Sequence, residues 1–233
     1  MEYPYIKLVM PPSLAKVPNG KMDAALLAKV KCGGQMWITA AKSFNAMYDA
    51  ALAAGIELKN IGDYRPLEPA LKLFLERYSK EDKGRKPQVT RTYEGATWYL
   101  KPGMAPCSTP GKSNHGWGLA IDLGYDQGGK TASMGGACFE WMCANAPSYG
   151  FYLQGSDPKS KEFEAWHWQY CLGDAAPNGA VQAAPAAAPA AAASDASITK
   201  LVCAVAGPAH VAAAQADSKS AVRKRGRAAR IIL

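Results

Sequence analysis

The chain has 233 residues, of which 48% are hydrophobic, and a formal net charge of +8. This length suffices for one domain with a full core, since a segment of about 150 to 180 residues buries roughly 70% of its unfolded surface. No run of about 20 apolar residues occurs, and no basic and then apolar segment opens the chain. The sequence therefore predicts a soluble chain, made in the cytoplasm without an export signal of its own.

The positive charge is concentrated at the C-terminal end. Residues 1–176 contain 20 Lys and Arg against 17 Asp and Glu, whereas residues 177–233 contain 7 against 2. Between them lies a stretch rich in Ala and Pro, which has too few large apolar residues to pack. We therefore expect a domain at residues 1–176, a linker at residues 177–197 and a basic tail at residues 198–233.

The tail ends in a cationic segment followed by three apolar residues. Residues 219–230 hold six Lys and Arg side chains, and Ile231, Ile232 and Leu233 follow them. Such a segment suits an anionic wall polymer or a membrane surface, where each cation contributes on the order of 1 kcal/mol. An equally weighted alternative is a solvated end without a partner. Nucleic acid is disfavoured because no aromatic residue is interleaved with the charges.

Helices are predicted in the first third of the chain. Residues 39–54 carry apolar residues at helical spacing and end before Gly55, a typical C-terminal cap. Residues 56–58 are expected to be extended. A second helix is expected after residues 62–66, running to about Tyr78.

The remainder predicts strands around one helix. Residues 80–112 are polar and rich in Gly and Pro, which indicates a long loop with a short strand at 97–100. Strands are expected at residues 119–125, 151–153 and 165–170, and a third helix at 137–146. This order predicts an α+β fold in which helices pack on a small antiparallel sheet.

Two of the three histidines lie in short segments that also contain a carboxylate. His115 precedes Asp122, and His167 follows Glu164. Two imidazoles and a carboxylate can hold Zn²⁺ while leaving a fourth position for water, which is the arrangement of a catalytic site. The alternative is a surface His115 and a hydrogen-bonded core His167, but the two segments support each other.

Separations in the sequence constrain the local structure of the site. Seven residues separate His115 from Asp122, which on a regular strand would place them on opposite faces, so we expect a bend at Gly116 and Gly118. Glu164 and His167 are three apart, so Glu164 is expected in the turn before the strand. There it would accept the proton of the attacking water. Arg65 would orient a substrate carbonyl or carboxylate, unless it forms an ordinary ion pair.

These motifs resemble a known family. The pattern Ser-x-His-x-x-Gly-x-Ala-x-Asp at residues 113–122, Glu-x-x-His-Trp at 164–168 and Tyr-Arg before a helix look like those of VanY-type zinc D-alanyl-D-alanine carboxypeptidases and related L-alanyl-D-glutamate endopeptidases. The resemblance covers about residues 18–172 and includes Asn19 and Gly20. One departure follows Arg65, where residues 66–69 read Pro-Leu-Glu-Pro instead of containing Ser and Gln.

The resemblance implies both a fold and roles for residues. The fold would be the one shared by hedgehog domains and DD-peptidases. His115, Asp122 and His167 would bind zinc, Glu164 would be the catalytic base, and Arg65 and Ser113 would contact substrate. The substrate would be a peptidoglycan stem peptide, and the predicted lack of an export signal favours a bacteriophage endolysin or a virion-associated wall hydrolase. Such an enzyme would reach the bacterial cell wall after release by another factor.

Two other classes stay open at this stage. A cysteine amidase or peptidase would use Cys138 or Cys143 with His167, although the six cysteines lack CxxC pairs and most are expected to be buried thiols. A second alternative is a protein that binds zinc or wall peptide without hydrolysis. Glu164 argues against it, because a structural zinc site takes a fourth protein ligand instead of a base.

Overall fold

The computed structural model describes residues 3–154 and 163–175, and the predicted linker and tail lie outside them. No helix in the described residues is both long and apolar enough to span a bilayer. The helices are α1 (Ile38–Ala53), α2 (Leu67–Arg77) and α3 (Gly136–Asn145), with short 3-10 turns η1 (Pro12–Leu14), η2 (Ala24–Leu26), η3 (Asn114–Trp117) and η4 (Ala146–Tyr149). The strands are β1 (Leu27–Lys29), β2 (Gln35–Trp37), β3 (Leu58–Gly62), β4 (Tyr78–Ser79), β5 (Thr90–Tyr93), β6 (Ala96–Leu100), β7 (Ala120–Gln127), β8 (Lys130–Ser133), β9 (Phe151–Leu153) and β10 (His167–Tyr170).

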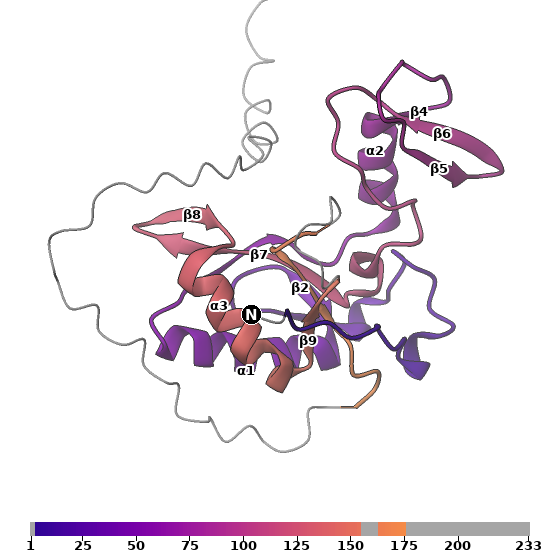
Figure 1. Ribbon diagram of the computed structural model, residues 1–233. Coiled ribbons are helices and arrows are strands. Elements are labelled where there is room, and N and C mark those ends of the chain that lie inside the picture. Colours follow the sequence, from indigo (N-terminus) through magenta and orange to yellow (C-terminus); the bar gives the residue numbers. More distant parts are fainter. Residues whose placement is uncertain (1–2, 155–162, 176–233) are drawn as a thin grey trace, which may run out of the picture. The chain divides into compact units, whose positions relative to one another are not determined.

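The predicted α+β fold is confirmed, with an antiparallel sheet at its centre (Figure 1). Its strand order is β3-β7-β10-β9, and β8 pairs with β7. Side chains alternate between the two faces of a strand. Ile121 of β7 therefore lies opposite Trp168 of β10 on one face, while Asp122 lies opposite His167 on the other. One face of the sheet carries the core and the other carries the polar residues of the predicted site.

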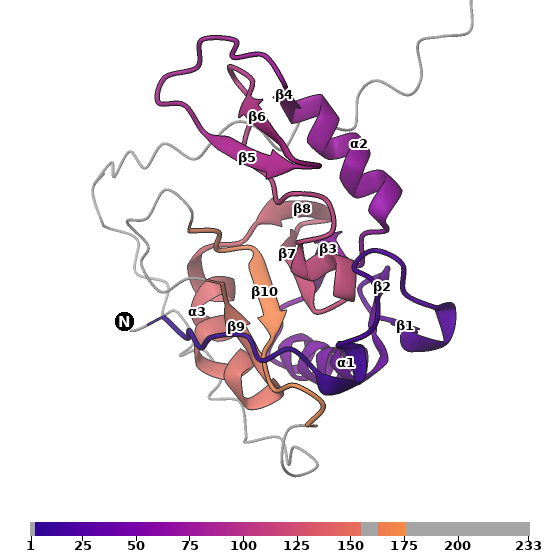
Figure 2. The ribbon, with the colours of Figure 1, turned by 90° about the vertical axis from the view of Figure 1, so that its right-hand side faces the viewer.

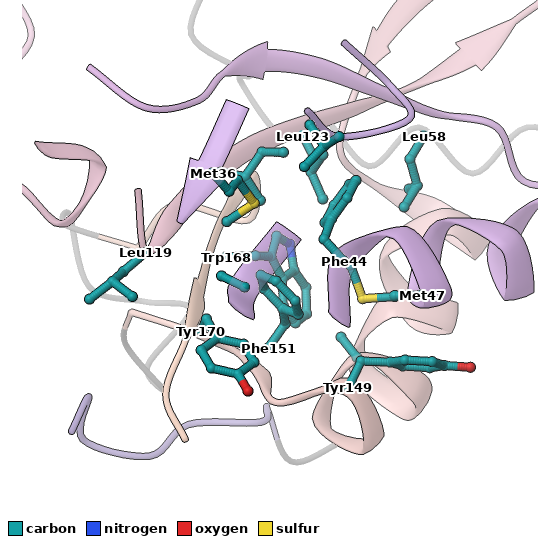
Figure 3. Close-up of a cluster of buried hydrophobic side chains, with 14 of the residues drawn as sticks. Met36, Phe44, Met47, Leu58, Leu119, Leu123, Tyr149, Phe151, Trp168 and Tyr170 are labelled. Atoms are coloured by element: carbon teal, nitrogen blue, oxygen red, sulfur yellow. The ribbon is translucent and has the colours of Figure 1, made fainter. Parts of the chain in front are cut away.

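The apolar face of the sheet packs against α1 and α3. Phe44 of α1 contacts Phe151 of β9 with ring centroids 5.8 Å apart, and Phe139 of α3 lies 6.3 Å from Trp168. Figure 3 shows Phe44 and Phe151 close to Trp168 in this cluster. Full burial of one such large apolar side chain contributes about 1.5–3 kcal/mol, so this cluster supplies a rigid support for β7 and β10.

Helix α1 confirms the prediction for residues 39–54. It has no internal Gly or Pro, and its buried residues recur on one face. The helix ends because Gly55 adopts a left-handed φ of +80°, which favours glycine. The backbone N–H of Gly55 then donates to the carbonyl of Leu52.

A second hydrophobic cluster joins α2 to a three-stranded sheet of order β4-β6-β5. Phe74 of α2 is at its centre, with ring centroids 4.7 Å from Tyr78, 5.4 Å from Tyr93 and 5.3 Å from Trp98. Figures 1 and 2 both show α2 alongside these strands. We refer to α2 with β4, β5 and β6 as the α2 lobe.

The α2 lobe corrects the prediction of a long loop at residues 80–112. The expected strand at 97–100 is present within β6, but it pairs with β5, which was not predicted. The two strands are joined by Glu94 and Gly95, both with positive φ, as a two-residue hairpin loop requires. Glu-Gly is a weak turn signal compared with Asn-Gly, so the hairpin was missed.

Four further strands were not predicted, and one of them is β4 in the α2 lobe. Strands β1 and β2 form a separate two-stranded sheet before α1. Strand β8 follows β7 through Gly128 and Gly129, both with positive φ. That Gly-Gly pair is a recognisable hairpin signal.

Candidate metal centre

Strand pairing brings Asp122 and His167 together. They are direct cross-strand partners in the β7–β10 pair, and both lie on the face opposite the core. The Nδ1 atom of His167 is 2.9 Å from Oδ1 of Asp122. The other ring nitrogen, Nε2, is buried without a hydrogen-bond partner in the described residues. Nδ1 is therefore the atom through which His167 serves the site.

His115 reaches the same carboxylate from η3. Its Nε2 atom lies 3.3 Å from Oδ1 of Asp122, and its ring centroid is 5.0 Å from that of His167. The predicted bend is confirmed, because η3 ends at Gly118 with a left-handed φ of +60°. A Cβ atom at Gly118 would lie 2.5 Å from the backbone nitrogen of Trp37, so the close approach of β2 also requires glycine.

The three donor atoms fit a zinc ion. All ligand atoms of His115, Asp122 and His167 lie within 4.8 Å of one another. Tetrahedral zinc with bonds of about 2.0–2.2 Å places its ligand atoms roughly 3.3–3.6 Å apart. The distances of 2.9 and 3.3 Å to Asp122 Oδ1 are close to that range. With two imidazoles and one carboxylate as ligands, a four-coordinate zinc would keep one position free.

The orientation of His115 is fixed by a backbone carbonyl. Its Nδ1 atom is 2.9 Å from the carbonyl oxygen of Asp63, which can only accept a hydrogen bond. Nδ1 therefore donates to this carbonyl, and Nε2 is the ring nitrogen that faces Asp122. Asp63 is itself held by β2, since its Oδ2 atom accepts from the backbone N–H of Gln35 at 2.6 Å.

Asp122 is a partly buried carboxylate that stays ionised. Burial alone would raise its pKa, but hydrogen bonds from His115 and His167 outweigh burial and hold the pKa well below the usual range. Gly62 allows the carboxylate to sit there, because a Cβ atom at that position would lie 2.7 Å from Oδ2 of Asp122. Asp122 therefore offers a negative charge to a cation throughout the neutral range.

Glu164 lies beside the cluster, directly before the turn that leads into β10, as predicted. Its carbonyl oxygen accepts a hydrogen bond from the backbone N–H of His167 at 3.0 Å. Burial is the main cause that raises the pKa of its carboxyl group. The charge of His167 lowers the pKa, and that of Asp122 raises it. A carboxylate with a raised pKa suits proton transfer.

Arg65 and Ser113 both lie next to His115 in the structure. The backbone N–H of Arg65 donates to the carbonyl of His115 at 3.0 Å, and Arg65 forms no ion pair with any described residue. The hydroxyl of Ser113 accepts from the backbone N–H of His115 at 3.3 Å as the N-cap of η3. That bond gives Ser113 a structural role, and its contact with substrate stays a prediction.

Residues without a predicted role hold the site together. Asn19 donates from Nδ2 to the carbonyl of Ser113 at 2.7 Å, and the N–H of Gly20 donates to the carbonyl of Gly116 at 2.7 Å. Gln169, on the same face of β10 as His167, accepts a hydrogen bond from Asn114 at 2.8 Å. The even spacing of Gln169 from His167 is a signal that could have indicated it.

The cysteines within the described residues do not form a nucleophilic site. Cys138, Cys143 and Cys171 are buried thiols, as predicted for most cysteines. Burial raises the pKa of Cys138 to about 12 and that of Cys143 to about 11. Neither is an activated thiolate at neutral pH. The neighbour within hydrogen-bond range of the Cys138 sulfur is the sulfur of Met134, at 3.5 Å, and not His167. These properties disfavour the cysteine-peptidase alternative.

The chain is similar to several known proteins. YodJ of Bacillus subtilis (strain 168), a candidate carboxypeptidase, is 30% identical over 146 residues, which are 59% of this chain and 46% of YodJ. The chain thus spans less than half the length of that relative.

Two solved structures are also similar. One is a mutant of the vancomycin-resistance D,D-pentapeptidase VanY in complex with Zn(II), with 20% identity, a TM-score of 0.44 and coverage of 71% of this chain and 86% of that one. The other is the LD-carboxypeptidase LdcB, with 22% identity, a TM-score of 0.45 and coverage of 65% and 71%. The family model for the D-alanyl-D-alanine carboxypeptidase VanY matches residues 34–174, more than half of the chain and all of the metal cluster. The chain belongs to the VanY family of D-alanyl-D-alanine carboxypeptidases.

Proposed function

We propose that this protein is a zinc-dependent peptidase that hydrolyses peptide bonds in peptidoglycan stem peptides. The observation that carries the proposal is the convergence of ligand atoms from His115, Asp122 and His167 within 4.8 Å. The backbone of Glu164 is bonded to His167 next to this cluster. Membership of a carboxypeptidase family supports the reaction class. The proposed zinc ligands are His115 Nε2, Asp122 Oδ1 and His167 Nδ1.

The proposed chemistry divides between the metal and the protein. A zinc ion bound here would supply a water with a pKa of about 7 and a Lewis acid for the scissile carbonyl. Glu164 accepts a proton as the water attacks and returns it to the leaving amine. Burial that raises the pKa of Glu164 favours this exchange, because it brings the carboxyl group closer to the pKa of its proton donor. Arg65 and Ser113 contact the substrate from either side of His115.

The first experiment identifies the peptide bond that the protein cleaves. The zinc-loaded protein is incubated with purified peptidoglycan, with and without a chelator, and the new termini are identified by mass spectrometry. Released terminal D-alanine would identify a carboxypeptidase, and new amino termini at D-glutamate an endopeptidase. Either product should disappear on chelation and return with zinc. Absence of a chelator-sensitive product would leave a protein that binds without hydrolysis.

Substitutions distinguish the role of Glu164 as a base from the roles of His115 and His167 as zinc ligands. Glu164→Ala should retain zinc but lose about 10²–10⁴-fold in hydrolysis rate, the usual contribution of general base catalysis. His115→Ala and His167→Ala should lose both zinc and hydrolysis. Glu140→Ala, on the far side of the sheet in α3, removes an exposed carboxylate and should change neither. Full activity of zinc-loaded Glu164→Ala would remove Glu164 from the mechanism.

We further propose that the protein acts at the bacterial cell wall in the manner of a phage endolysin, with a virion-associated wall hydrolase as the alternative. The Ala/Pro-rich residues 177–197 and the basic residues 198–233 support this setting, because tethering a weak wall-binding element raises the local concentration of a peptidase. Lysis of cells by the full chain, compared with a chain ending at residue 176, tests the contribution of the tail. Equal lysis at equal zinc content would remove the tail from the proposal.

A further inference from the structure

The segment of residues 17–22 links two parts of the chain that lie far from it in the sequence. On one side it is bonded to Ser113 and to η3, the turn that carries His115. On the other side it is bonded to residues 64–67, which lead into α2. The segment precedes residues 34–174, which the family model matches. We refer to residues 17–22 as the brace.

His115 differs from the other two candidate ligands in having no strand to position it. Asp122 and His167 are cross-strand partners in the central sheet, so the strand register sets their separation. His115 lies in η3, a 3-10 turn of four residues. A turn this short makes few hydrogen bonds of its own, and those bonds have poorer geometry than the bonds of an α-helix. Its position therefore depends on the segments that are bonded to it.

The brace holds the backbone on both sides of His115. Asn19 donates from Nδ2 to the carbonyl of Ser113 at 2.7 Å. The backbone N–H of Gly20 donates to the carbonyl of Gly116, also at 2.7 Å. The two acceptors lie two residues before His115 and one residue after it, so the ligand is fixed from both directions along the chain.

The contact between the brace and η3 is also close in its packing. A Cβ atom at Gly116 would overlap the side chain of Asn19, so the turn approaches Asn19 as closely as a glycine allows. Nε1 of Trp117 donates to the carbonyl of Val17 at 3.2 Å. Displacement of the brace would therefore displace η3 with it.

The brace is held in turn by the residues that lead into α2. The backbone N–H of Leu67 donates to the carbonyl of Gly20 at 2.9 Å. The backbone N–H of Met22 donates to the hydroxyl of Tyr64 at 3.0 Å. These two bonds tie the brace to a segment that is itself bonded to the metal cluster.

That segment closes a set of hydrogen bonds around His115. Nδ1 of His115 donates to the carbonyl of Asp63 at 2.9 Å, and the backbone N–H of Arg65 donates to the carbonyl of His115 at 3.0 Å. The brace, η3 and residues 63–67 are thus bonded pairwise to one another. His115 lies where they meet.

We propose that Asn19 is a positioning residue for the zinc ligand His115, and that its bond to Ser113 holds η3 where Nε2 of His115 faces Asp122. The inference rests on the proposed function, because it assumes that His115 binds zinc. Asn19 is bonded to the turn and not to the side chain of a metal ligand, so it acts on the metal through η3. Gly20 acts through its backbone, which makes Asn19 the residue whose contribution a substitution can remove.

The first measurement is the zinc affinity of the full chain, by competition with a chelator of known affinity. Asn19→Ala removes the donor, and Asn19→Asp keeps the shape but places an acceptor against the carbonyl of Ser113. Both variants should bind zinc about 10–100-fold more weakly, the range seen when groups that orient a metal ligand are altered. If Asn19 merely filled space, Asn19→Asp would bind zinc as tightly as the wild-type protein.

Asn45 provides the matched control. It is half-buried like Asn19, and its side chain is also bonded to backbone groups, namely the carbonyl of Lys29 at 3.2 Å and the N–H of Lys31 at 2.8 Å. These bonds join α1 to residues in and after β1 and involve no metal ligand. Asn45→Ala should therefore lower stability without changing zinc affinity.

The second measurement reports ligand geometry directly. Cobalt(II) replaces zinc, and its visible absorption depends on the number and arrangement of its ligands. The spectrum should change in Asn19→Ala and Asn19→Asp but not in Asn45→Ala. If Asn19→Ala fails to fold, Asn19→Ser, which keeps a donor on a shorter side chain, should show a smaller change in the same direction.

The outcomes separate the inference from the proposed function. A wild-type protein that binds no zinc would overturn both. A wild-type protein that binds zinc, together with unchanged zinc affinity and an unchanged cobalt(II) spectrum in Asn19→Asp, would overturn the inference alone. A lower melting temperature in the Asn19 variants with both metal measurements unchanged would likewise reduce Asn19 to a structural residue.

Discussion

The central sheet and the α2 lobe each have their own hydrophobic core, and the two cores differ in size. The sheet packs on α1 and α3 through a cluster that includes Phe44 and Trp168, and its opposite face carries the metal cluster. The α2 lobe has a much smaller core around Phe74, Tyr78 and Leu100. The candidate ligands Asp122 and His167 belong to the first region.

The difference matters because metal ligands must be positioned more precisely than groups that contact a substrate. Metal ligands must stay within a few tenths of an ångström, and strands of a well-packed sheet provide that. Groups that select among substrates tolerate more movement and are commonly placed on loops or small appended elements. A small core also opens more readily, which suits a surface that admits a peptide.

The largest effects are expected from one core substitution in each region. Phe44→Ala should lower the free energy of unfolding of the whole described domain by about 3–5 kcal/mol, because it leaves a cavity against Phe151. Phe74→Ala should have a similar local cost but act on the α2 lobe. Hydrogen exchange should then rise in β5 and β6 while β7 and β10 stay protected. Equal acceleration in all four strands would show that the lobe is not a separate unit of stability.

A single methyl group next to the metal ligand tests how rigid the sheet face is. Gly62→Ala would place a Cβ atom 2.7 Å from Oδ2 of Asp122, so the carboxylate must move. We expect zinc affinity to fall about 10–100-fold, the range seen when the surroundings of a metal ligand are altered. The measurement is competition with a chelator of known affinity. Gly135→Ala, where the nearest atom lies 3.9 Å from the added Cβ, is the matched control.

The cluster of His115, Asp122 and His167 could be predicted because its residues are rare and chemically distinctive. Two of three histidines with adjacent carboxylates indicated His115, Asp122, His167 and Glu164, and the odd spacing of seven required the bend observed at Gly118. The groups that orient these residues could not be found in this way. Asp63 acts on His115 through a backbone carbonyl, which every residue type has, so its role depends on the fold alone.

The fold was predicted best where the apolar pattern was long. The prediction of α1 was correct because apolar residues recur on one face over its sixteen residues. The prediction of β7 was correct because apolar residues alternate along the strand around Asp122. In the α2 lobe the helix and the strand at 97–100 were predicted, whereas β4 and β5 were missed, because these two strands have only two and four residues and their core includes aromatic side chains that are half-buried. Short strands of this kind are defined by their partners and not by their own sequence.

The hairpin that escaped prediction offers the smallest and most local test of the α2 lobe. Glu94 has a left-handed φ of +49°, which is strained for a residue with a side chain of this kind, whereas Asn adopts it more readily. Glu94→Asn should therefore stabilise the lobe by about 0.5–1 kcal/mol. Slower amide exchange confined to β5 and β6, with unchanged zinc affinity, is the expected result. Slower exchange that extended to β7 and β10 would mean that the two regions open together and that the α2 lobe is not a separate unit of stability.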